Sequence, residues 1–136
     1  MKQLNFELSP DVLPITVFVS YGEDTEEALK YFHKQTDLRF DVNGSHSGCV
    51  WVDTKADNRK GYKTFLFIRG DKKRPGAGLA GLVAHEAVHI SYILSECAGS
   101  FFDPRIQEPQ CYFVQFLVEC ICDRIWAHIS KKGKAK

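Results

Sequence analysis

The chain has 136 residues, which is enough for one domain whose core does not need disulfides. Hydrophobic residues make up 44% of it and charged residues 26%, and the formal net charge is +1. These proportions are ordinary for a globular domain, and a charge near zero gives no general attraction to nucleic acid or membranes. We expect residues 1–130 to form a single domain and residues 131–136, which are rich in lysine, to form a flexible basic tail.

No segment of the chain predicts export or membrane insertion. The first residues lack the unbroken apolar core of a secretory signal, and no stretch reaches about 18 apolar residues. The five cysteines are an odd number without a Cys-x-x-Cys pair, so we interpret them mostly as reduced packing residues. The expected location is the cytoplasm.

The first half of the chain predicts a strand, a helix and a pair of strands. Residues 13–21 are rich in β-branched and aromatic types, which favours a strand. A helix should follow, beginning at Asp24 or Thr25, because both are good N-cap residues. Residues 49–53 and 62–69 have strand composition on either side of a polar turn, so they should pair as a hairpin.

The second half predicts two long helices. After a glycine-rich crossing at residues 70–78, residues 79–97 are apolar on nearly every side of a helix. The last helix should reach about Ile129 and begin either at Asp103-Pro104 or at Glu108. Together the elements predict an α+β fold with a small, three-stranded, mainly antiparallel sheet.

The sequence His85-Glu86-Ala87-Val88-His89 interrupts the first of these helices with groups that apolar helices normally avoid. His85 and His89 are one turn apart, so both imidazoles project from the same face and can converge on one cation. Burying such groups is costly unless they are paired or bind a metal. This His-Glu-x-x-His arrangement predicts a zinc site in which Glu86 takes a proton from the water that the metal activates.

A catalytic zinc ion usually has three protein ligands and one open position, so another residue must complete the site. We favour Glu108, because the 18 residues between it and His89 suffice to end one helix, turn and return antiparallel. Glu119, about three turns further along the same face, is the competing carboxylate, and Cys111 is a weaker alternative. Glu96 is interpreted as an acid of the cleft or surface.

The motif and its spacing resemble the gluzincin metallopeptidases, in which His-Glu-x-x-His is followed by a glutamate on a second helix. Residues 108–114 also resemble the Glu-Pro-x-x-Tyr helix of small phage and bacterial proteins, the minigluzincin-like set. The resemblance covers residues 79–126 and implies a compact zincin-like domain. It also implies that His85, His89 and Glu108 bind zinc and that Glu86 acts as general base.

Two further roles stay open at this point. Tyr112 replaces an aspartate that larger gluzincins commonly carry there; it could hydrogen-bond a ligand or substrate, or be a core tyrosine. A donor to the developing oxyanion could come from Tyr62, His46 or Arg69, and the sequence gives no geometry to choose among them.

Two functions of different class fit these observations. The first is a zinc-dependent peptidase that binds an extended peptide or protein segment along an edge strand. The alternative is a metal-containing phage protein that binds a host regulatory or defence protein in the host cytoplasm without turnover, since one short domain leaves little chain for a deep cleft. A purely structural zinc usually has four protein ligands. No nucleic-acid or membrane partner is expected.

Overall fold

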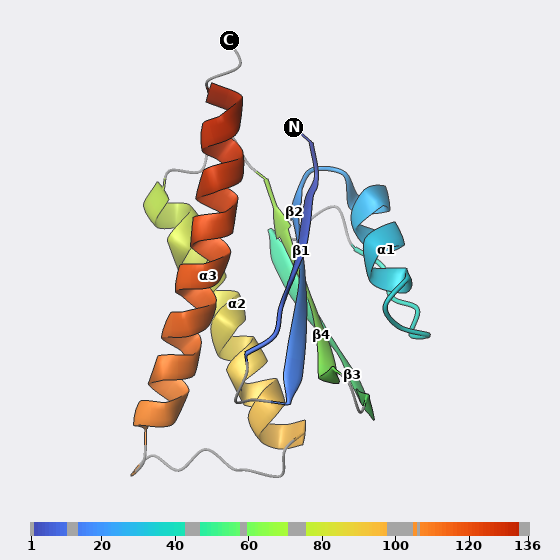
Figure 1. Cartoon of the computed structure of the whole chain (residues 1–136), viewed down its shortest axis with the longest axis vertical. Helices are drawn as coiled ribbons and strands as arrows, with labels where there is room; N and C mark the ends of the chain where they lie inside the picture. Colours follow the sequence, from blue (N-terminus) through green and yellow to red (C-terminus); the bar gives the residue numbers. More distant parts are fainter. Residues whose placement is uncertain are drawn as a thin grey trace.

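The structure is a computed structural model that describes residues 2–10, 14–42, 47–57, 60–70, 76–97, 105 and 107–133. These residues form an α+β fold in which one sheet of four strands is flanked by helices (Figure 1). In chain order the elements are β1 (Leu4–Leu8), β2 (Ile15–Gly22), α1 (Thr25–His33), β3 (Gly48–Asp57), β4 (Gly61–Arg69), α2 (Gly76–Cys97) and α3 (Glu108–Gly133).

The strand order across the sheet is β1-β2-β4-β3. β2 pairs parallel with β4, while β1 pairs antiparallel with β2, and β3 pairs antiparallel with β4. Every residue of β2 is buried, as expected for a central strand with helices on both faces of the sheet. Among the described strands β3 has a neighbour on one side only, so its other edge carries backbone groups without a strand partner.

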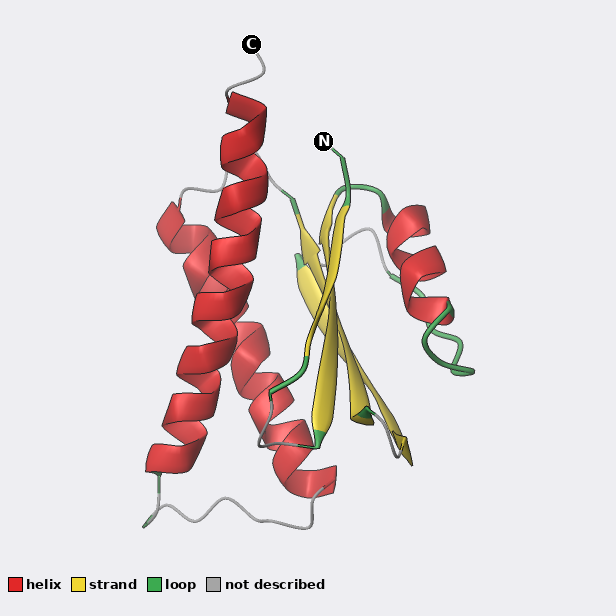
Figure 2. Cartoon of the chain, viewed as in Figure 1, coloured by secondary structure: helices red, strands yellow, loops and turns green. Residues whose placement is uncertain are grey.

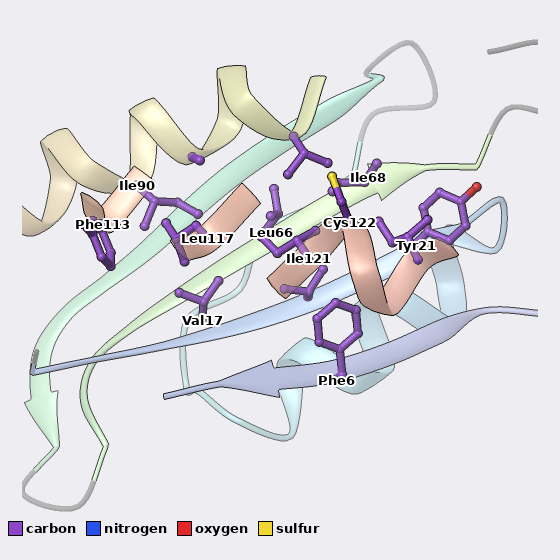
Figure 3. Packing of buried hydrophobic residues seen from close by; sticks show 14 of the residues in the cluster. Phe6, Val17, Tyr21, Leu66, Ile68, Ile90, Phe113, Leu117, Ile121 and Cys122 are labelled. Carbon is purple, nitrogen blue, oxygen red and sulfur yellow. The ribbon is translucent and has the colours of Figure 1, made fainter. Parts of the chain in front are cut away.

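Helices α2 and α3 cover one face of the sheet, and α1 covers the other (Figure 2). Side chains alternate between the two faces along β4: Leu66 and Ile68 pack under α2 and α3, whereas Phe65 and Phe67 pack under α1. Figure 3 shows the larger cluster, in which apolar residues of both long helices meet the sheet. Its fully buried helical members are Val83, Ala87, Ile90, Leu117, Ile121 and Ile125.

The two long helices are antiparallel. Near the start of α3, Gln110 Nε2 donates to Ser91 Oγ near the end of α2, at 2.5 Å. Near the other end of α3, the ring of Trp126 lies so close to Gly76 that a Cβ there would be 3.0 Å from it. These two contacts fix which face of α2 is turned toward α3.

The fold class predicted from the sequence is confirmed, but the sheet has four strands, not three. The missed strand is β1, whose five residues carry polar Asn5 and Glu7 between apolar neighbours and pair with β2 along its whole length. The hairpin of β3 with β4 is as expected, and α3 begins at Glu108, the second of the two starts that the sequence left open. Asp24 is the N-cap of α1, since its side chain accepts a hydrogen bond from the backbone of Glu27.

Two boundaries were wrong. Residues 76–78, expected in the crossing segment, form the first turn of α2, and α3 continues to Gly133, so residues 131–133 of the expected tail are helical. The remainder of the crossing, residues 71–75, and the end of the tail, residues 134–136, lie outside the described residues.

Helix α2 is long and apolar enough to cross a membrane by length and composition, contrary to the expectation that no segment is. Here it packs along the sheet with Val83, Ala87 and Ile90 fully buried. Its apolar character therefore has a use within the fold, since one stripe of the helix supplies much of the core.

Candidate metal centre

The His-Glu-x-x-His motif lies in the middle of α2, and its three functional side chains do not share one environment. His85 and His89 are exposed, whereas Glu86 is only 5% exposed. The difference follows from helical geometry, because Glu86 is adjacent to the buried stripe formed by Val83, Ala87 and Ile90. The motif thus straddles the boundary between the core and the surface.

The two imidazoles converge at their Nε2 atoms. These atoms are 3.2 Å apart, and the ring centroids are 4.9 Å apart with the ring planes at 72°. Two ligands bound tetrahedrally to zinc at about 2.0–2.1 Å place their nitrogen atoms about 3.3–3.4 Å apart. The separation in the protein is close to this value, so the histidine pair fits two positions of a zinc coordination sphere.

The Glu86 carboxylate lies against the beginning of β3. A Cβ atom added to Gly48 would be 3.1 Å from Oε1 of Glu86 and 3.3 Å from its Cδ. Real Cβ contacts are rarely so short, so the absence of a side chain at Gly48 leaves the space that the carboxylate occupies. The buried acid is therefore enclosed between α2 and the outermost described strand of the sheet.

The charge of the Glu86 carboxylate affects the pKa of the neighbouring thiol, Cys49. The pKa of Cys49 is raised to about 11, first by burial and then by the negative charge of Glu86, while the positive charge of Arg69 partly offsets the shift. The Arg69 backbone N–H donates to Ser47 O at 2.8 Å, and its guanidinium lies 5.6 Å from the centre of the Phe67 ring. A basic residue is thus held at the same end of β3 as Glu86.

The predicted third ligand lies elsewhere. Glu108 is the first residue of α3 and is exposed, whereas Gln110, two residues later, contacts Ser91 on α2. Two residues correspond to about 200° of rotation around a helix, so Glu108 points away from the contact with α2. By the same argument His89, two residues before Ser91, lies on a face of α2 different from the one that α3 covers.

Within the described part of the chain, no group of three or more histidine, cysteine, aspartate or glutamate side chains is arranged to hold a metal ion. The structure brings His85 and His89 together but does not bring Glu108 to them. Glu119 accepts a hydrogen bond from Gln115 Nε2 at 2.9 Å, and Cys111 is exposed, so neither alternative completes the pair here. The third ligand remains a prediction.

The structure also distinguishes among the candidate donors to the oxyanion. The Tyr62 hydroxyl donates to Cys97 O at 2.9 Å, at the end of α2, and His46 lies outside the described residues. Arg69 and Glu86 both act on the pKa of the Cys49 thiol, so of the two described candidates Arg69 is the one linked to Glu86. Tyr112 is 65% exposed, which excludes the interpretation as a core tyrosine.

A pocket with a volume of about 380 Å³ lies near the C-terminal end of α2. It lies between the last turns of α2 and the β3–β4 hairpin, and its lining residues are Val52, Thr54, Tyr62, Ile93, Glu96 and Cys97. The sequence carries one signal for it: Glu96 is seven residues after His89, which is nearly two helical turns and so the same face.

Comparison of the chain with protein-family models, with curated proteins and with solved structures finds no match. The function of the site is therefore argued from its geometry and from the sequence motif.

Proposed function

We propose that the protein is a zinc-dependent peptide hydrolase in which His85 and His89 hold the metal and Glu86 is the general base. The observation that carries the proposal is the convergence of two imidazole Nε2 atoms to 3.2 Å beside a carboxylate that is only 5% exposed. A bound zinc ion would supply Lewis-acid polarisation of a carbonyl group and activation of a water molecule.

Glu86 has the surroundings that a proton carrier needs. Its carboxylate is buried and lies against Gly48, so its position is restricted by the packing of α2 on β3. In peptide hydrolysis Glu86 would accept the proton of the attacking water and then deliver it to the nitrogen of the leaving amine. Burial keeps bulk water from competing for this proton.

The edge of β3 offers a place for the substrate. A peptide that adds to this edge would gain main-chain hydrogen bonds and would pass Gly48, where the general base lies. This mode of binding needs a shallow surface and not a deep cleft, which suits a chain of 136 residues. The expected substrate is therefore an extended segment of a peptide or protein.

Glu108 is kept as the proposed third ligand. Since it is not grouped with the two histidines among the described residues, its role requires the first turn of α3 to change position when metal binds. Glu119 and Cys111 remain the alternatives.

The first experiment measures zinc content and peptide hydrolysis together. Glu86→Gln should keep its zinc and fold but lose hydrolysis by at least about 100-fold, because only the proton carrier is removed. His85→Ala and His89→Ala should lose both zinc and hydrolysis. If Glu86→Gln cleaves an identified peptide as fast as wild type, the general-base role is wrong.

The second experiment identifies the third ligand. Glu108→Ala should lower zinc occupancy, whereas Glu119→Ala should retain it. Loss of zinc in the Glu119 variant alone would transfer the assignment to that residue.

A binding function without turnover is the second candidate, and one observation favours it. Large apolar side chains are exposed on the two long helices, with Tyr92 54% and Tyr112 65% exposed. Exposed aromatic residues of this kind often mark surfaces that contact other proteins. Under this alternative the biological effect of the protein survives Glu86→Gln, whereas under the hydrolase proposal it disappears.

A further inference from the structure

The pocket at the end of α2 is positioned to contact a peptide bound along β3. Val52 and Thr54 belong to β3, and Ile93 and Glu96 belong to the two helical turns that follow His89. The seven residues from His89 to Glu96 span about 10 Å of helix, and the four residues from Gly48 to Val52 span about 13 Å of β3. The histidine pair and the pocket therefore follow one another along the same face of α2.

The lining of the pocket combines an apolar wall with an acid. Val52 and Ile93 contribute apolar side chains, while Glu96 contributes a carboxylate. The Tyr62 hydroxyl donates a hydrogen bond to Cys97 O and so ties together two residues that line the pocket. With a volume of about 380 Å³ the pocket is at the small end of the range for ligand sites, which suits one side chain.

Among the described residues, no lysine or arginine forms an ion pair with Glu96; the one ion pair found there joins Lys60 to Glu7. Its negative charge is felt at the neighbouring thiol, since the pKa of Cys97 is raised by burial and by Glu96. An exposed acid at the rim of a partly apolar pocket complements a side chain with an apolar stem and a cationic head.

We infer that this pocket binds a lysine or arginine side chain of the peptide and that Glu96 determines this specificity. The inference rests on the proposed function, because it assumes that the peptide substrate binds along the edge of β3. Antiparallel addition gives the stronger pairing. β3 runs from Gly48, beside Glu86, toward Thr54 at the pocket, so an antiparallel peptide has its N-terminal part at the pocket. On β3 four to six residues separate Gly48 from Val52 and Thr54, so the basic residue should lie about four to six positions before the cleaved bond.

The test uses eight-residue peptide mixtures in which one position at a time is fixed as lysine, glutamine or glutamate. Cleavage is measured with wild-type protein loaded with zinc, and binding is measured by fluorescence anisotropy in the Glu86→Gln background. We expect lysine at one position to improve binding and cleavage about three- to tenfold over glutamine, and glutamate to weaken them.

Variants of Glu96 separate the charge from the shape of the pocket. Glu96→Gln should remove the preference for lysine, and Glu96→Lys should replace it with a preference for glutamate. Glu26→Gln makes the same chemical change on α1, on the other face of the sheet, and should leave the preference unchanged.

The outcomes distinguish the inference from the proposed function. Cleavage of peptides with no preference for a basic residue, or with the same preference in Glu96→Gln, overturns the assignment of the pocket and leaves the hydrolase proposal intact. Binding without such a preference and without cleavage overturns both. Peptides that bind with the Glu96-dependent preference but are never cleaved support the pocket and overturn the hydrolase proposal. Absence of both binding and cleavage across the mixtures overturns both.

Discussion

At the scale of single residues, the contact between Gly48 and Glu86 is the feature with the sharpest consequence. Gly48→Ala would place a methyl group 3.1 Å from Glu86 Oε1, so the carboxylate must move by a few tenths of an ångström. Small misplacement of a proton carrier can cost up to about 100-fold in rate. We expect hydrolysis to fall by tenfold or more while zinc content, measured by atomic absorption, stays at the wild-type level.

Gly81→Ala is the matched control for this prediction. Gly81 lies on the same helix as Glu86, and a Cβ added there meets nothing within 4 Å. The control should hydrolyse peptides at the wild-type rate. Equal activity in the Gly48 and Gly81 variants would show that the space at Gly48 does not position the carboxylate.

The thiol of Cys49 reports the position of Glu86 without any substrate. Because the pKa of Cys49 is raised to about 11 by burial and by Glu86, its thiolate is scarce at pH 8 and alkylation should be slow. In Glu86→Gln one of the causes is removed, so the pKa should fall and alkylation should accelerate; a fall of one pKa unit raises the thiolate fraction about tenfold.

The measurement is iodoacetamide labelling of each cysteine, followed by mass spectrometry. Cys111 is exposed and serves as the internal reference, with a rate that should be the same in both proteins. An unchanged rate at Cys49 in Glu86→Gln would place the carboxylate away from the thiol.

Residue types and spacing were sufficient to predict that His85 and His89 meet on one face of the helix, because contacts one turn apart on a helix are local. The convergence of the two imidazoles follows directly from that spacing. The contact of Glu86 with Gly48 joins residues on different elements, and it depends on how α2 lies over β3. Nothing in the neighbourhood of either residue in the sequence could predict it.

At the scale of elements, α2 contains a position where stability can be increased. Gly81 is exposed within the helix and a Cβ there would lie in open space. Alanine restricts the unfolded chain more than glycine does, so Gly81→Ala should raise the free energy of unfolding by about 0.5–1 kcal/mol. Urea denaturation followed by circular dichroism measures the change.

Gly76→Ala provides the contrast in that experiment. Gly76 is at the first residue of α2, where a Cβ would be 3.0 Å from the Trp126 ring. The crowding should offset the gain in helix propensity, so this variant should be no more stable than wild type. A gain at Gly76 equal to the gain at Gly81 would contradict the close packing of α2 on the end of α3.

Helices and strands with a clear hydrophobic periodicity could be predicted from the sequence. Which face each helix turns toward its neighbour could not. The existence of α3 could be predicted, and Pro109, which favours the first turn of a helix, made Glu108 one of its two possible starts. The face that α3 turns toward α2 is decided by packing of residues such as Leu117 and Ile121, which many rotations could bury. For this reason the sequence predicted Glu108 as a ligand, whereas the structure leaves it exposed and apart from the histidines.

At the scale of the whole molecule, the candidate metal site and the core share one helix, α2. One side of the helix carries the imidazole pair, and the other side supplies Val83, Ala87 and Ile90 to the cluster that joins the sheet with α3. A ligand that binds the folded histidine pair and not the unfolded chain must stabilise the entire packed unit. Metal binding should thus be visible as a change in global stability.

Zinc should therefore raise the melting temperature of the protein. At a free zinc concentration 100 times the dissociation constant, the expected stabilisation is about 2.7 kcal/mol, which corresponds to several degrees for a domain of this size. His85→Ala and His89→Ala should lose the shift, because one imidazole cannot replace the converging pair. His128→Ala should keep it, since His128 lies near the end of α3 and contacts Lys2 O instead. Differential scanning fluorimetry with and without a chelator measures each shift within one variant, so a change in intrinsic stability does not interfere. An equal shift in wild type and both single-histidine variants would show that zinc binds elsewhere on the chain.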